Sequence, residues 1–197
     1  MSAPPPSDRK YTRRVIVVTV ITVALFLGTV GPVVYVGCSA WRKRTSKIKT
    51  VEAHEHLARI VRGARDYFDA DHYDARGEPL PRCFPSNAGA ALVTHADMSR
   101  GCCPAPCPAG DLWDADGGNG AGWHALAFGL SDPHYYKYRF VGGCCRGTDC
   151  STAGFTAQAI GDLNCNGITA LFERTGRVVD GEVKVSPLEY DPAKELE

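Results

Sequence analysis

The chain lacks an excess of charge of either sign. Its 197 residues include 22 Lys and Arg against 22 Asp and Glu, so overall charge does not indicate a nucleic-acid partner. The motifs of several common enzyme classes are also absent: there is no Gly-x-Ser-x-Gly elbow, phosphate-binding loop, dinucleotide fingerprint or Cys-x-x-Cys redox pair. We therefore expect a binding or structural protein and not an enzyme.

One long apolar run is present, at residues 15–37, and it contains no charged residue. A helix of about 20 apolar residues is long enough to cross the roughly 30 Å of hydrocarbon in a bilayer. The run predicts a transmembrane helix at residues 15–37, preceded by a cytoplasmic tail at residues 1–14. Pro32 should bend that helix, because proline removes one backbone hydrogen bond.

The helical pattern continues beyond the apolar run. Apolar residues recur at spacings of three, four and seven, which places them on one face of a helix. The soluble half of the same helix is therefore predicted at residues 38–70. The apolar residues in question are Ile48, Val51, Leu57, Ile60, Val61, Ala64 and Phe68.

Cysteine is abundant in the last two thirds of the chain. An even set in a Gly- and Pro-rich region indicates a disulfide framework, which requires an oxidising compartment. Zinc is conceivable, but vicinal cysteines rarely both bind one ion, so we favour disulfides without naming pairs. Cys38 is left over. The eight disulfide candidates are Cys83, Cys102, Cys103, Cys107, Cys144, Cys145, Cys150 and Cys165.

Alternating apolar residues after the irregular stretch at residues 71–122 predict several strands. Together with the helix they indicate the α+β class: a long N-terminal helix, membrane-spanning in its first half, packed on a small antiparallel sheet with disulfide-rich loops. The predicted strands are residues 123–130, 134–141, 155–160, 169–174 and 182–185.

Several segments in this order resemble the type IV pilin and pseudopilin (fimbrial) superfamily: EHLARIVRGARDYF at residues 55–68, DPHYYKYRF at residues 132–140 and FTAQAIGDLNCNG at residues 155–167. The resemblance implies that residues 71–197 form a pilin-like domain outside the cytoplasm. It implies a bacterial inner-membrane protein with one span, whose C-terminal domain lies in the periplasm or on the cell surface.

The same resemblance implies a structural or assembly role in a type IV pilus or a type II secretion-like system. The expected partners are the lipid bilayer and other pilin-like subunits or assembly components, with no nucleic acid. The chain departs from the family before the apolar run, where Arg13, Arg14 and Val15 replace the processing glycine and no glutamate follows. We therefore expect an uncleaved anchor. The alternative is an envelope adhesion or binding protein carrying a lipid on Cys38.

A calcium-loop template fits the region between the third and fourth predicted strands. Oxygen ligands at alternate positions, followed by a glycine and a later glutamate, are the pattern that wraps a Ca²⁺ ion. Only two carboxylates are present, so the predicted structural site is weak, with a Kd of about 0.1–1 mM. An Asp/Asn-Gly hairpin without metal is the alternative. The candidate ligands are Asp162, Asn164, Asn166, Ile168 and Glu173.

Overall fold

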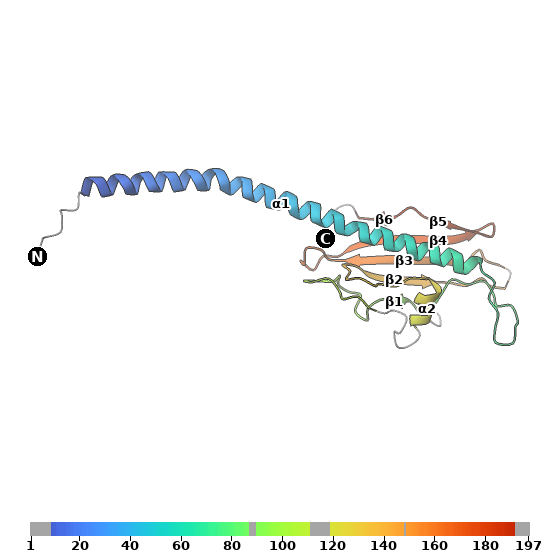
Figure 1. The fold of residues 1–197 in the computed structure, drawn as a ribbon. Helices are drawn as coiled ribbons and strands as arrows, with labels where there is room; N and C mark the ends of the chain where they lie inside the picture. The colour runs from blue at the N-terminus through green and yellow to red at the C-terminus, as the bar shows by residue number, and fades with distance from the viewer. Residues whose placement is uncertain (1–8, 87–89, 111–118, 148, 192–197) are drawn as a thin grey trace, which may run out of the picture. The chain divides into compact units, whose positions relative to one another are not determined.

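The computed structural model describes residues 9–86, 90–110, 119–147 and 149–191 (Figure 1). Within these ranges the side chains are described except at residues 9–12, 27, 29, 31–33, 35, 38–40, 42–43 and 119–120. The lipid on Cys38 and most of the predicted tail therefore lie outside the described part, whereas Pro32 stands within the helix assigned to Arg9–Asp69. The chain divides into two compact units, Met1–Thr45 and Ser46–Glu197.

Helix α1 extends over Arg9–Asp69. The transmembrane span predicted within it has to be corrected. Among the described residues, no helix has the length and apolar character needed to cross a membrane. The fold class with a membrane-spanning half, and the location as a single-pass inner-membrane protein, are therefore wrong.

In the second unit the strands form one antiparallel sheet in the order β1-β2-β3-β4-β5, with β6 paired to β4. The longest pairing joins β3 to β4, which face each other from Gly154 and Arg177 to Gly161 and Ala170. The strands are β1 Leu92–Val93, β2 Lys137–Gly142, β3 Gly154–Gly161, β4 Ala170–Val179, β5 Glu182–Val185 and β6 Glu189–Tyr190.

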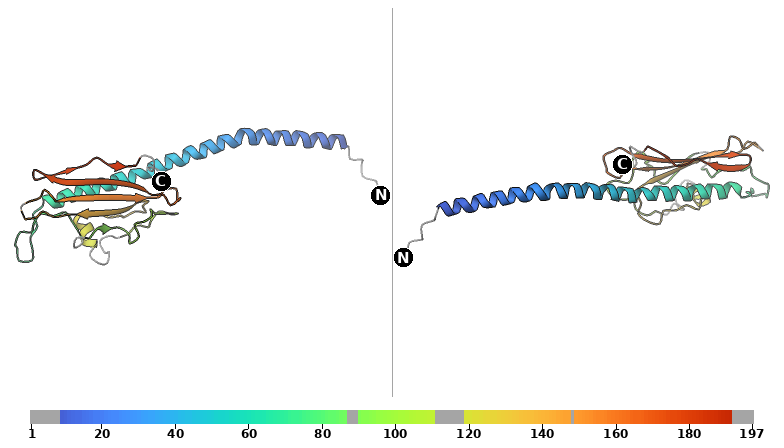
Figure 2. Two further views of the ribbon diagram at one scale, coloured as in Figure 1. Left: turned by 180° about the vertical axis from the view of Figure 1, so that it is seen from behind. Right: turned by 90° about the horizontal axis from the view of Figure 1, so that it is seen from above.

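The part of α1 that belongs to this unit lies along one face of the sheet (Figures 1 and 2). Strand β3 alternates strictly between partly buried and buried residues, as expected where one face of a strand meets a helix. Its buried positions include Ala157 and Ala159, whose small side chains let the helix approach closely. Five residues of the expected helical face are buried: Leu57, Ile60, Val61, Ala64 and Phe68.

The first turns of that face differ from the expectation. Ile48 and Val51 are 66% and 51% exposed, whereas Thr50 and Ala53 are buried. Ala53 lies four residues before Leu57, so it shares the buried face. Val51 lies two residues before Ala53, and residues at that spacing point to different sides of a helix.

The strand expected at residues 123–130 is wrong. Residues Asn119–Ala125 form the short helix α2, and Ala127 has a φ of 47°, which no strand residue adopts. Leu126, Phe128 and Leu130 are buried as their alternation suggested. A short apolar run does not distinguish a strand from the end of a buried helix, so periodicity alone gave the wrong element.

The disulfide prediction is confirmed. All eight cysteines beyond Cys38 are paired, in two long-range and two local bonds. In each vicinal pair, one cysteine forms a disulfide with a distant segment and the other forms a disulfide with a cysteine five residues away. The bonds are Cys83–Cys144, Cys102–Cys107, Cys103–Cys165 and Cys145–Cys150.

Helix α1 and the segment after α2 touch at Gly63. A Cβ atom built there would lie 1.9 Å from the carbonyl oxygen of Leu126, a backbone atom that cannot turn aside. We expect Gly63→Ala to lower the free energy of unfolding by about 1–3 kcal/mol, measured by denaturant titration. Gly28→Ala is the matched control in the same helix, because nothing lies within 4 Å of its Cβ position. An unchanged Gly63→Ala variant would contradict this close contact.

Candidate functional site

The predicted calcium loop is the connection between β3 and β4. The carboxylate of Asp162 is buried and accepts hydrogen bonds from the backbone N–H groups of Asn166, at 3.2 Å, and Gly167, at 3.0 Å. The side-chain oxygens of Asn164 and Asn166 accept from the N–H groups of Asn166 and Ile168. Gly167 has a φ of 86°, a conformation that glycine adopts without strain. Three of the predicted ligands are thus brought together in one turn.

Glu173 is not brought to this turn. It lies within β4 opposite Gln158 of β3, and its carboxylate accepts a 2.6 Å hydrogen bond from the amide of Gln158. The β3–β4 ladder ends at Gly161 and Ala170, three residue pairs closer to the loop, which is about 10 Å along the strands. Ile168 belongs to the turn and is 49% exposed. In a calcium loop the chain folds back, so that the residue at position 12 returns to the ion. Here the chain continues as strand β4, which carries Glu173 away from the turn.

A second polar site connects α1 with the start of β2. The carboxylate of Glu52 accepts hydrogen bonds from the backbone N–H groups of Tyr135, at 3.0 Å, and Tyr136, at 3.2 Å. It also accepts from the hydroxyl of Tyr138 at 3.1 Å. Because that hydroxyl donates to Glu52, its oxygen accepts from Nδ1–H of His56 at 2.9 Å. One carboxylate on the helix thus organises three residues of the sheet.

Burial sets the ionisation states in this network. Burial, followed by the positive charge of Arg59, lowers the pKa of His56 to about 4, so His56 is uncharged at neutral pH. Burial and the neighbouring Glu52 carboxylate raise the pKa of Tyr138, which keeps its proton. A cavity of about 180 Å³ lies beside the network, lined by Glu52, His56, Arg59 and residues 129–134. The cavity is too small for a substrate of drug-like size.

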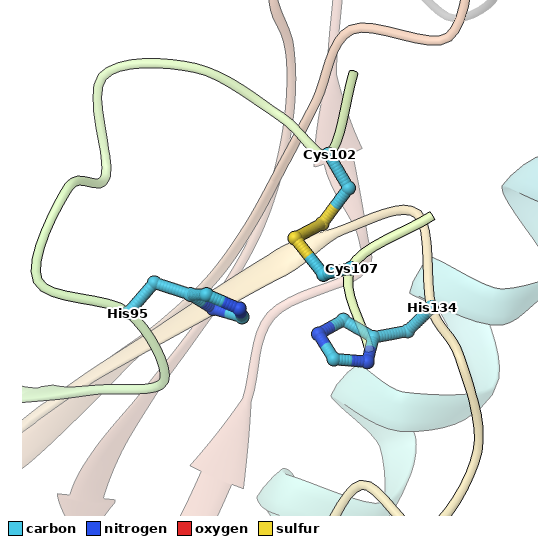
Figure 3. Close-up of side chains that lie close together, drawn as sticks. All are labelled: His95, Cys102, Cys107 and His134. Carbon is cyan, nitrogen blue, oxygen red and sulfur yellow. A yellow bond between two sulfur atoms is a disulfide. The ribbon is translucent and has the colours of Figure 1, made fainter. Parts of the chain in front are cut away.

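A third group combines two histidines and two cysteines, shown in Figure 3. One ligand atom from each of His95, Cys102, Cys107 and His134 lies within 4.8 Å of every other one. Cys102 and Cys107 are joined in a disulfide. Burial, followed by electrostatic interaction with His134 and Lys137, lowers the pKa of His95 to about 4, so this imidazole is neutral.

Sequence reasoning missed Glu52 and the two histidines. Glu52 stands 83 residues before Tyr135, and His134 stands 39 residues after His95, so no local spacing links them. The one available signal was Glu52 beside the buried face of the helix, where an acidic residue needs a donor. The expected absence of a catalytic constellation remains untested.

Comparison with known proteins adds no relative. No family model matches the chain, and no curated protein or solved structure matches it. The function must therefore be argued from the geometry.

Replacing the Glu52 carboxylate should destabilise the second unit. We expect Glu52→Gln to lower the free energy of unfolding by about 1–3 kcal/mol, because an amide is uncharged and replaces one acceptor oxygen with an NH₂ donor facing the backbone N–H donors. Glu55→Gln, an exposed glutamate of the same helix, should change it by less than about 0.5 kcal/mol. Denaturant titration of both variants measures the difference, and equal effects would contradict a structural role for Glu52.

Proposed function

We propose that the chain is a structural subunit of a pilin-like assembly, in which the N-terminal part of α1 packs against the same helix of other copies. The observation that carries this proposal is the exposure of apolar side chains along that part of the helix. Seven of them between residues 15 and 23 are 46–62% exposed: Val15, Ile16, Val17, Val18, Val20, Ile21 and Val23.

The distribution of these side chains favours several neighbours over one. Val15, Ile16, Val17 and Val18 are consecutive, and successive helical residues point about 100° apart, so the apolar surface surrounds the helix. A dimer needs only one apolar stripe. A helix that is apolar on all sides is buried on all sides, as at the centre of a bundle of identical helices.

The second unit supports the same proposal in a different way. Its helical face is already covered by the sheet, with Leu57, Ile60 and Phe68 fully buried. Disulfides hold the loop at Cys83 to the segment after β2 and the loop at Cys103 to the β3–β4 turn. A unit that is complete by itself can be carried by an assembling helix without taking part in the contact between helices.

We also propose a weak structural Ca²⁺ site in the β3–β4 turn, formed by Asp162, Asn164 and Asn166. The supporting observation is the buried Asp162 carboxylate, which accepts hydrogen bonds from two backbone N–H groups. The ion pairs among the described residues are Arg82–Asp71 and Lys184–Glu182, so no cationic side chain compensates this carboxylate. Each carboxylate oxygen keeps a further lone pair for a cation.

Assembly should depend on the apolar surface of the first unit. We expect the full chain to form discrete species larger than a dimer in analytical ultracentrifugation. Val18→Glu should weaken association at least about tenfold, because each contact would then bury a charge.

Val51→Glu is the matched control, since Val51 is another valine of the same helix that is more than half exposed, and it lies in the second unit. It should leave association unchanged. A wild-type chain that stays monomeric, or a control variant that dissociates as readily as Val18→Glu, would contradict the assembly.

Calcium should stabilise the second unit through the turn alone. For a Kd of about 0.1–1 mM, 10 mM Ca²⁺ should raise the free energy of unfolding by about 1.4–2.7 kcal/mol. Asp162→Asn should abolish this increase. Glu173→Gln should leave it intact, because Glu173 is bonded to Gln158 within the sheet. Denaturant titrations with and without Ca²⁺ measure all three, and an unresponsive wild-type chain would rule out the site.

A further inference from the structure

Two histidines and a short disulfide loop meet at the start of β2, outside both sites proposed above. His95 follows β1, Cys102 and Cys107 close an exposed loop, and His134 precedes β2 (Figure 3). With their disulfide intact, the two sulfur atoms are bonded to each other and are not thiolate ligands. Once the disulfide is reduced, the same four side chains form a Cys₂His₂ set, a common ligand set of structural zinc.

We propose that reduction of the Cys102–Cys107 disulfide converts this cluster into a tetrahedral Zn²⁺ site with ligands His95, Cys102, Cys107 and His134. The inference is independent of the proposed assembly function.

His134 carries the strongest indication of a ligand. Its side chain is 2% exposed, and its Nε2 atom has no hydrogen-bond partner among the described residues. Its other ring nitrogen, Nδ1, bonds to the backbone carbonyl of Asp132 at 3.2 Å, so Nδ1 carries the proton and Nε2 presents a lone pair. Metal-binding histidines are typically oriented by such a bond to a carbonyl. Figure 3 shows this ring directed toward His95 and the disulfide.

His95 is held by a comparable contact. Its Nδ1 atom lies 2.9 Å from the hydroxyl of Thr94, and that hydroxyl accepts a bond from the backbone N–H of Tyr138 in β2. The two imidazole rings lie with their centroids 5.3 Å apart. Both rings are therefore fixed by the backbone of the sheet or its neighbouring residues, and not by the disulfide.

The cysteine loop has the spacing and the support that the site requires. Four residues separate Cys102 from Cys107, which falls within the spacing of two to four that structural zinc sites use. Cys107 and His134 exchange backbone hydrogen bonds of 2.8 and 3.0 Å, and the neighbouring Cys103 is bonded to Cys165. These contacts hold the loop in place when the local disulfide opens.

A dithiol reductant transfers two electrons and two protons to the Cys102–Cys107 bond, which breaks to give two thiols while the reductant forms its own disulfide. Zn²⁺ then replaces the two thiol protons, which leave to solvent, and accepts one lone pair from each imidazole. In a tetrahedral site with Zn–S bonds of about 2.3 Å, the sulfur atoms lie about 3.8 Å apart. Cys107 is partly exposed and gives the reductant access.

The chain contains a matched control for this proposal. Cys145 and Cys150 form a disulfide with the same separation of five residues, and again the first cysteine is buried and the second partly exposed. Among the described residues, no histidine or carboxylate cluster accompanies that pair. Reduction should therefore create a metal site at the first loop and not at the second.

The test is a Co²⁺ titration of the full chain, with and without a phosphine reductant. Tetrahedral Co²⁺ bound to thiolates absorbs in the visible range, so it reports the ligands directly. We expect the reduced chain to bind one Co²⁺ that Zn²⁺ displaces, and the oxidised chain to show no thiolate-bound cobalt. Cys102→Ser/Cys107→Ser should lose the absorption, whereas Cys145→Ser/Cys150→Ser should keep it.

The histidines are tested separately, because buried His134 also contributes to packing. We expect His134→Gln and the partly exposed His95→Gln each to weaken Co²⁺ binding at least about tenfold. Circular dichroism identifies any variant that fails to fold. If His134→Gln does not fold, the Co²⁺ affinity of His95→Gln alone tests whether the histidines are ligands. The proposal is overturned if the reduced chain shows no cobalt–thiolate absorption, if the control pair is equally required, or if folded His95→Gln binds Co²⁺ as tightly as the original chain.

Discussion

The Glu52 carboxylate joins the helix of the second unit to its sheet. It accepts two backbone N–H groups at the residues that lead into β2 and one phenol from β2 itself. These residues stand just before Lys137, where the β2–β3 ladder begins, and the helix supplies an acceptor for their N–H groups. The position of His134 follows from this contact, because it precedes Tyr135 directly.

The four disulfides that hold the irregular segments close loops of two very different lengths. The bonds Cys83–Cys144 and Cys103–Cys165 close loops of 61 and 62 residues, whereas Cys102–Cys107 and Cys145–Cys150 close loops of five. In the chain-entropy model, a long loop contributes about 4 kcal/mol and a five-residue loop about 2 kcal/mol. The vicinal arrangement therefore places one strong and one weak constraint side by side.

The parts of the fold that follow local rules could be predicted from the sequence. The buried face from Leu57 to Phe68 repeats at helical spacing, and the alternation in β3 shows directly as FTAQAIG. The eight outer cysteines indicated disulfides by number and context. Their pairing could not be predicted, because eight cysteines allow 105 arrangements and only the folded chain selects one.

The parts that failed depend on contacts between distant residues. Glu173 fits the calcium template by its number, yet the β3–β4 register pairs it with Gln158 and keeps it from the turn. Residues 123–130 alternate like a strand but begin as helix α2. The transmembrane span was predicted from an uncharged run, but no helix among the described residues has the length and apolar character to cross a membrane.

The β3–β4 turn and the His/Cys cluster are connected through one short segment. Gly101 lies so close to the turn that a Cβ atom there would be 2.2 Å from the backbone nitrogen of Asp162, and Cys103 is bonded to Cys165 within the turn. Between these two anchors stands Cys102, which faces the histidines. Opening the weak local disulfide leaves both anchors in place, so the chemistry at Cys102 can change while the shape of the turn is kept. The two vicinal cysteines thus have different roles. The Cys103 disulfide maintains the fold, and Cys102 can exchange its bond to Cys107 for a bond to a metal ion.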